Sequence, residues 1–375
     1  MQSSAVRYLF LAVLALLVFN QCNALLHSRV RTSLRSQTRD FSLSVSVDEC
    51  VKLHEEFMTN VAKIDPPTRL RSLLELTEMT GDELVSPRAR EGLNPFLIPI
   101  SKSKEDGTLT CFIRWPTQKE GMELQLVKTT ETGIVLQALS TDNYCHRLAV
   151  ELDFQGAAKA SEAVDNLNKL GQLYTIGDYL PFLKSGKFPA ITEADLRLVL
   201  DRYLLTKVGA FPDAYERLAL NFLATGNDVS ALVTCERAVS LFYSWGHPIH
   251  FHTKVLKKIG RDMESKDSAR GAMGMPMWTI ARSRQDLEDA AHFAGFSSTK
   301  ILAEMHAFRV VDAREKDVAE GLSPIQVTLD QAAHLMDAVA LGGVEGGWDT
   351  ARVDISQRYR DGGYPDMADF IDTVV

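Results

Sequence analysis

The chain has little cysteine, and its five cysteines are widely spaced with no Cys-x-x-Cys pair. A disulfide scaffold is excluded, because such scaffolds are found in short chains that are rich in cysteine. Cys145 and His146 combine a thiol with a base, but adjacent side chains point apart on a helix or a strand. We therefore interpret Cys145 as a core residue and His146 as a polar surface residue.

The sequence also lacks the short motifs that carry common enzyme chemistry. It contains no phosphate-binding loop, no dinucleotide-binding glycine fingerprint, no nucleophile elbow and no His-Glu-x-x-His zinc motif. We predict no catalytic residue and no cofactor, which favours a role other than catalysis. The alternative is an enzyme whose site is assembled from distant residues.

Positive charge is not in excess, since the formal net charge is -8. Broad affinity for nucleic acid is disfavoured, because it depends on clustered lysine and arginine. A content of 45% hydrophobic and 24% charged residues is typical of a soluble globular chain. No helical repeat of fixed spacing is present, which leaves open a repeat-like packing without sequence repeats. The acidic balance disfavours an RNA-processing repeat protein, because such a protein needs a basic concave face.

The N-terminus has the pattern of a cleavable signal peptide. One basic residue, Arg7, precedes the apolar run Tyr8 to Phe19, and small polar residues lead to Ala24. The run is too short for a membrane-spanning helix, which needs about 20 apolar residues. We predict a signal peptide over residues 1–24 and no permanent membrane span in the mature protein.

The next segment, residues 25–46, resembles an organelle transit peptide. It is rich in arginine and serine and has no acidic residue before Asp40. The two signals in series, with Ala24-Leu25 at the junction, resemble the bipartite presequence of algae with secondary plastids. We predict delivery to the chloroplast stroma; a secreted protein with a disordered basic arm is the alternative.

A change of hydrophobic period divides the remaining chain into three parts. Residues 47–92 predict two short helices, broken by Pro66-Pro67, and a linker. Residues 93–155 contain short apolar runs separated by glycine turns, which is typical of antiparallel hairpins. Residues 156–375 have helical periodicity, and we expect about eight helices at typical lengths.

The predicted fold is therefore α+β and predominantly α, with a small antiparallel β unit followed by a multi-helix bundle. Three Ser/Thr positions with Asp or Gln three residues later predict helix starts, namely Thr192, Ser283 and Thr328.

Three histidines in six residues, His247, His250 and His252, are weak candidates for a metal site. On a helix that begins at Pro248, His250 and His252 lie about 200° apart, so they cannot share a face. Because no further ligand follows at a known spacing, we predict a helix start with packing or surface histidines and no metal.

Several strings resemble a family of nucleus-encoded plastid proteins of plants and algae. They run from Leu93 to the C-terminal region: Asn94 to Pro99, Arg114-Trp115-Pro116, Met275 to Thr279, Leu329 to Ala333 and Glu345 to Trp348. The resemblance implies a role in biogenesis of the chloroplast ATP synthase, as an auxiliary factor and not a subunit.

Together these observations predict a soluble plastid assembly factor, or chaperone, that binds a protein client, with an ATP synthase subunit as the client. Trp278 and Trp348 are candidate contacts with the partner, because tryptophan is enriched where few residues carry most of the binding energy. The alternative for both is burial in the core. The stretch Ala269 to Trp278, with three methionines, fits an adaptable binding surface, but we interpret it as a buried crossing between helices.

Overall fold

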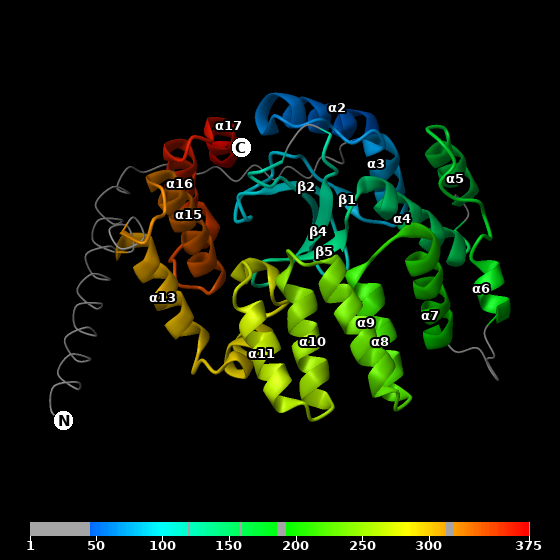
Figure 1. The fold of residues 1–375 in the computed structure, drawn as a ribbon. Coiled ribbons are helices and arrows are strands. Elements are labelled where there is room, and N and C mark those ends of the chain that lie inside the picture. Colours follow the sequence, from blue (N-terminus) through cyan, green and yellow to red (C-terminus); the bar gives the residue numbers. More distant parts are fainter. Residues whose placement is uncertain (1–45, 119–120, 158–159, 186–192, 313–318, 375) are drawn as a thin grey trace. The chain divides into compact units, whose positions relative to one another are not determined.

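The computed structural model describes residues 46–118, 121–157, 160–185, 193–312 and 319–374. The predictions for residues 1–45 and for a helix start at Thr192 lie outside these ranges. Contacts within residues 44–375 form one unit, and it has the predicted α+β architecture with mostly helices (Figure 1). No helix in the described ranges combines the length and the apolar character that crossing a membrane requires.

The predicted N-terminal helix pair is present as α2 (Val47–Phe57) and α3 (Leu70–Met79). A π-helical turn, η1 (Met58–Ala62), extends α2 and ends at Lys63 in the left-handed conformation. Pro66 and Pro67 lie in the connection, where no intrahelical N–H is needed. Helix α2 is tied to the sheet, because His54 Nε2 lies 2.9 Å from Pro99 O in strand β2 (Leu97–Lys102).

Five antiparallel strands follow the chain order in a single sheet. They are β1 (Glu83–Leu84), β2, β3 (Leu109–Ile113), β4 (Gln125–Thr129) and β5 (Ile134–Ala138). Phe112 at the centre pairs with Ile98 on one side and Leu126 on the other. Five successive residues of β2 are buried, so both faces of that strand are covered. The ladder shifts register between Pro99 and Ser101, where a proline without an N–H can be accommodated.

The β unit is shorter than predicted, because residues Thr141–Phe154 form helix α4. Large apolar residues occupy every second position in the second half of this segment, as they would in a strand: Leu148, Val150, Leu152 and Phe154. Ser140 nevertheless caps a helix by accepting a hydrogen bond from Asn143 N. Helix α4 is buried on several sides, so it has no single polar face. Its sequence therefore lacks the alternation of one apolar and one polar face that indicates a helix.

Twelve α-helices follow Gly156 in the described residues, more than the eight expected, because several have eleven residues or fewer. They are α5 (Ala160–Asn168), α6 (Leu180–Ser185), α7 (Glu193–Tyr203), α8 (Pro212–Ala224), α9 (Asp228–Leu241), α10 (Gly246–Lys258), α11 (Asp262–Ala272), α12 (Arg284–Ala294), α13 (Thr299–Asp312), α15 (Pro324–Ala340), α16 (Gly347–Asp361) and α17 (Pro365–Asp372). From α8 to α12 each helix contacts the next, and α13, α15, α16 and α17 continue the series.

Two of the predicted helix starts can be compared with the structure. Ser283 caps α12 as predicted, since its Oγ accepts a hydrogen bond from Asp286 N. Thr328 was wrong as a start, because it lies inside α15. That helix begins four residues earlier, where Ser323 and Gln326 form a capping box and Pro324 occupies the first turn.

Candidate functional site

The three histidines named from the sequence lie on α10 but face different neighbours. The nearest polar partners are Glu216 Oε1 at 2.9 Å for His247 Nε2, Asp286 Oδ1 at 3.0 Å for His250 Nε2, and Ser268 Oγ at 3.5 Å for His252 Nδ1. These partners belong to α8, α12 and α11. The structure therefore does not bring the three imidazoles together, and each one bridges α10 to a different helix.

His250, which is buried, is part of a small ionic cluster with Asp286 and the 40% exposed Lys254. Burial lowers the pKa of His250, although the hydrogen bond to Asp286 opposes this change. Burial would raise the pKa of Asp286, but hydrogen bonds from His250 and Lys254 lower it overall. The cluster therefore favours a neutral imidazole beside a carboxylate that Lys254 neutralises, which joins α10 to the start of α12.

The two candidate tryptophans differ in accessibility. Trp278 is 3% exposed and packs against Phe96 and Trp115, with ring centroids 6.0 and 5.5 Å away. A partner could reach this ring only if its neighbours moved. Trp348 is half-buried near the start of α16 and packs against the main core. Of the two, only Trp348 presents part of its side chain to solvent.

Cys145 and His146 do not form a nucleophile and base. Cys145 is fully buried, and burial strongly raises the pKa of its thiol. His146 is also mostly buried, with Nε2 3.1 Å from Tyr203 Oη, and burial lowers its pKa to about 4. The interpretation of Cys145 as a core residue is confirmed, while that of His146 as a surface residue was wrong.

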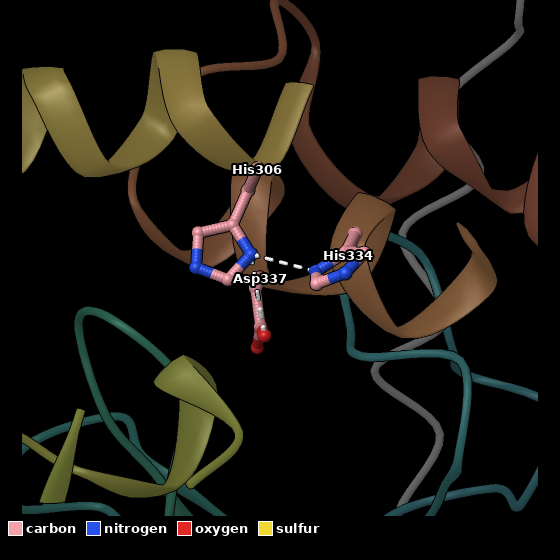
Figure 2. A group of neighbouring side chains, drawn as sticks. All are labelled: His306, His334 and Asp337. Atoms are coloured by element: carbon pink, nitrogen blue, oxygen red, sulfur yellow. Dashed lines mark hydrogen bonds and ion pairs between the residues drawn. The ribbon is translucent and has the colours of Figure 1, made fainter. Parts of the chain in front are cut away.

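A group that the sequence analysis missed lies between α13 and α15 (Figure 2). His306 Nδ1 is 3.1 Å from His334 Nδ1 and 3.6 Å from Asp337 Oδ2. One nitrogen or oxygen of each residue lies within 4.8 Å of the others. His334 and Asp337 are three residues apart on α15, so they share a face of that helix. This spacing was a signal in the sequence, whereas nothing local indicates that His306 joins them.

The environment of this group is largely dry. The side chains of His306 and Asp337 are 15% and 12% exposed. Burial raises the pKa of Asp337 to about 7, although a hydrogen bond from Met277 N, 2.7 Å from Oδ1, lowers it in part. Burial and the neighbouring His334 lower the pKa of His306 to about 4. Imidazole and carboxylate are the donors of many divalent metal sites.

The opposite face of α13 carries an exposed apolar stripe, which we define as Ile301, Met305, Phe308 and Val311. Their exposed fractions are 42%, 51%, 54% and 51%. Spacings of four, three and three residues place them within about a third of the helix circumference. Leu302 and Ala303 are buried on the other side, so α13 is apolar on two faces but packed on one.

Comparison with known proteins identifies three domain families in sequence order. Residues 52–186 match the PAB N-terminal family, residues 212–297 the PAB middle domain and residues 304–374 the PAB C-terminal domain. No solved structure matches the chain.

A relative in Arabidopsis thaliana, named "Protein IN CHLOROPLAST ATPASE BIOGENESIS, chloroplastic", is 35% identical over 336 residues. The match covers 89% of this chain and 94% of that protein. The plastid family indicated by the sequence strings is thus confirmed, and this chain belongs to the PAB family of plant plastid proteins.

Proposed function

We propose that this protein is an auxiliary factor in biogenesis of the plastid ATP synthase, and that it holds one subunit of the enzyme before assembly. The name of the Arabidopsis relative supports the process. The observation that carries binding of a client is the exposed apolar stripe on α13, with four large side chains between 42% and 54% exposed. Contiguous exposed apolar residues are typical of protein contact surfaces.

The client we propose is a subunit with a basic surface around an apolar patch. The net charge of -8 favours a basic partner, because complementary charge accelerates encounter. The stripe would then lengthen the lifetime of the complex by burying apolar surface. Trp348 remains a candidate contact, since it is half-buried near the start of α16.

Replacing Ile301 and Phe308 together with serine is expected to weaken client binding at least about tenfold, because two exposed apolar anchors are lost. The measurement is the Kd for purified ATP synthase subunits, tested one at a time, at low and at high salt. Binding should also weaken as salt rises. The fold should be retained, since both side chains are more than two-fifths exposed.

A matched control is available on α9, where Val229 and Val233 are 73% and 58% exposed. Serine at both positions should leave the Kd unchanged. Equal affinity of the α13 double variant and the wild type would remove the stripe from the interface. In cells, loss of the protein should lower assembled ATP synthase while the photosystems stay unchanged; normal ATP synthase levels would refute the proposed process.

We further propose that the protein reaches the plastid stroma through the bipartite presequence. The name of the relative includes the word chloroplastic, and a signal-like and a transit-like segment stand in series in residues 1–46. Residues 1–46 fused to a fluorescent reporter should carry it into the plastid of an alga with secondary plastids. Appearance of the reporter in the medium would instead establish the secreted alternative.

The second candidate function is an enzyme with a site assembled from distant residues. One observation favours it, namely the convergence of His306 with His334 and Asp337 from two helices. Three donors around an open position are typical of catalytic metal sites. We rank binding of a client first, because the exposed stripe on α13 favours contact with another protein. That argument is independent of whether the two histidines and Asp337 are catalytic.

A further inference from the structure

We propose that His306, His334 and Asp337 form a zinc site that links α13 to α15. His306 lies on α13, and His334 and Asp337 lie on α15. Figure 2 shows the imidazole of His306 directed at that of His334, with the side chain of Asp337 beside them, and one donor atom of each residue lies within 4.8 Å of the others. Neither the sequence motifs nor the name of the relative assigns a metal to this family member.

The distances within the group fit tetrahedral coordination. Zinc bonds of about 2.0–2.1 Å to imidazole nitrogen or carboxylate oxygen place neighbouring ligand atoms roughly 3.3 Å apart. The observed separations from His306 Nδ1 are 3.1 Å to His334 Nδ1 and 3.6 Å to Asp337 Oδ2. Both therefore fall within about 0.3 Å of the required edge, and the ligand atoms of all three residues lie within 4.8 Å of one another.

The carboxylate is held in the orientation that coordination needs. Met277 N donates a hydrogen bond to Asp337 Oδ1 at 2.7 Å, which leaves Oδ2 toward His306. Such contacts outside the ligand set orient the ligands and are common around bound metals. Met277 belongs to the short 3-10 helix η3 (Met277–Thr279), so the site would also fix that segment to α15.

The competing explanation is a hydrogen bond between two neutral imidazoles. One proton shared between His306 Nδ1 and His334 Nδ1 accounts for 3.1 Å, but it does not account for the approach of Asp337 Oδ2 to 3.6 Å from the same His306 nitrogen. A zinc ion replaces that proton, binds both nitrogens and offsets the charge of Asp337. A water molecule would complete four-coordination, since three protein ligands leave one position open.

The function of this metal would be to fix α13 against α15 with the exposed stripe facing outward. This role does not depend on the identity of a client. His306 lies on the packed face of α13, while Met305 and Phe308 lie on the exposed face. Removal of zinc should therefore loosen the helix that presents the stripe.

The test begins with the purified protein, stripped by a chelator and titrated with Zn²⁺ or with Co²⁺. We expect one Zn²⁺ per chain, a rise of a few degrees in Tm at saturation, and Co²⁺ absorption of tetrahedral intensity. His306→Gln and Asp337→Asn should each weaken binding at least about tenfold and abolish the rise in Tm. If Asp337→Asn fails to fold, His306→Gln provides the test alone.

His292→Gln is the matched control, because His292 has its own partners, Ser297 O and Glu288, away from the group. It should bind zinc as the wild type does. Three results would overturn the proposal: no stoichiometric zinc, zinc retained in full by His306→Gln, or zinc lost only when His247, His250 and His252 are replaced. The last result would place the metal on α10 instead.

Discussion

Replacing Arg90 with alanine is expected to lower the free energy of unfolding by about 3–5 kcal/mol. Arg90 is 0% exposed, and its guanidinium donates hydrogen bonds to four backbone carbonyls. The acceptors and distances are Leu97 O at 3.0 Å, Phe370 O at 2.6 Å, Thr373 O at 2.8 Å and Pro95 O at 2.5 Å. Alanine would leave these carbonyls without their donor and open a cavity.

The planar shape of the guanidinium allows Arg90 to reach all four carbonyls at once. Arg90 also stacks over the ring of Phe370, with its Cζ 4.0 Å from the ring centroid. Burial and the neighbouring Arg352 lower the pKa of Arg90 to about 9. Lysine should recover less than half of the loss, because one ammonium cannot reach carbonyls that lie on different sides of a planar fork.

The control is Arg88→Ala, two residues earlier, where the side chain is exposed. That change should cost less than about 1 kcal/mol, since Arg88 contributes mainly a cation–π contact with Phe57. The measurement is urea unfolding of each variant with the slope m compared. Similar losses for Arg88→Ala and Arg90→Ala would show that the buried hydrogen bonds contribute little.

Arg90 connects the beginning of β2 to the C-terminal helix α17, because its guanidinium contacts both Leu97 O and Phe370 O. Arg352 on α16 donates to Arg90 O and Leu93 O, both at 2.9 Å, and to Ile371 O at 3.2 Å. The two arginines thus hold residues 90–97 against α16 and α17. No local pattern predicts the links from Arg90 to Phe370 and Thr373 or from Arg352 to Arg90 and Leu93, because each joins residues more than 250 positions apart.

Local signals in the sequence predicted most elements but not all of their boundaries. The hairpins were predictable because glycine turns separate short apolar runs, and Ser283 was predictable as a cap. Helix α4 was missed because the alternation from Leu148 to Phe154 imitates a strand, and only tertiary burial on several sides explains it.

The candidate site was predictable only in part. His334 and Asp337 have the spacing of two ligands on one helix face, whereas His306 reaches them by the packing of α13 on α15. The exposed stripe on α13 was invisible for a different reason. Leu302 and Ala303 on the packed side are also apolar, so the sequence alone does not indicate which face is covered.

The other large effect is expected at Gly133, in the turn between β4 and β5. A Cβ atom at this position would lie 2.0 Å from Trp278 O and 2.6 Å from Trp278 C. Both are backbone atoms, so rotation of a side chain cannot relieve the clash. A hydrogen bond also joins this turn to the residues that follow Trp278, since Thr132 Oγ1 donates to Ala281 O at 2.9 Å.

Gly133→Ala is therefore expected to cost at least about 3 kcal/mol, by pushing the hairpin away from the segment that carries Trp278. Tryptophan fluorescence should change at the same time, because Trp278 packs against Trp115 at 5.5 Å between ring centroids. Gly271→Ala on α11 is the control: its Cβ would meet only Ile249 Cγ2, at 3.9 Å, so the change should be neutral or stabilise by up to about 1 kcal/mol. If urea unfolding and fluorescence of Gly133→Ala match those of Gly271→Ala, the close approach of the hairpin to Trp278 is not part of the folded protein.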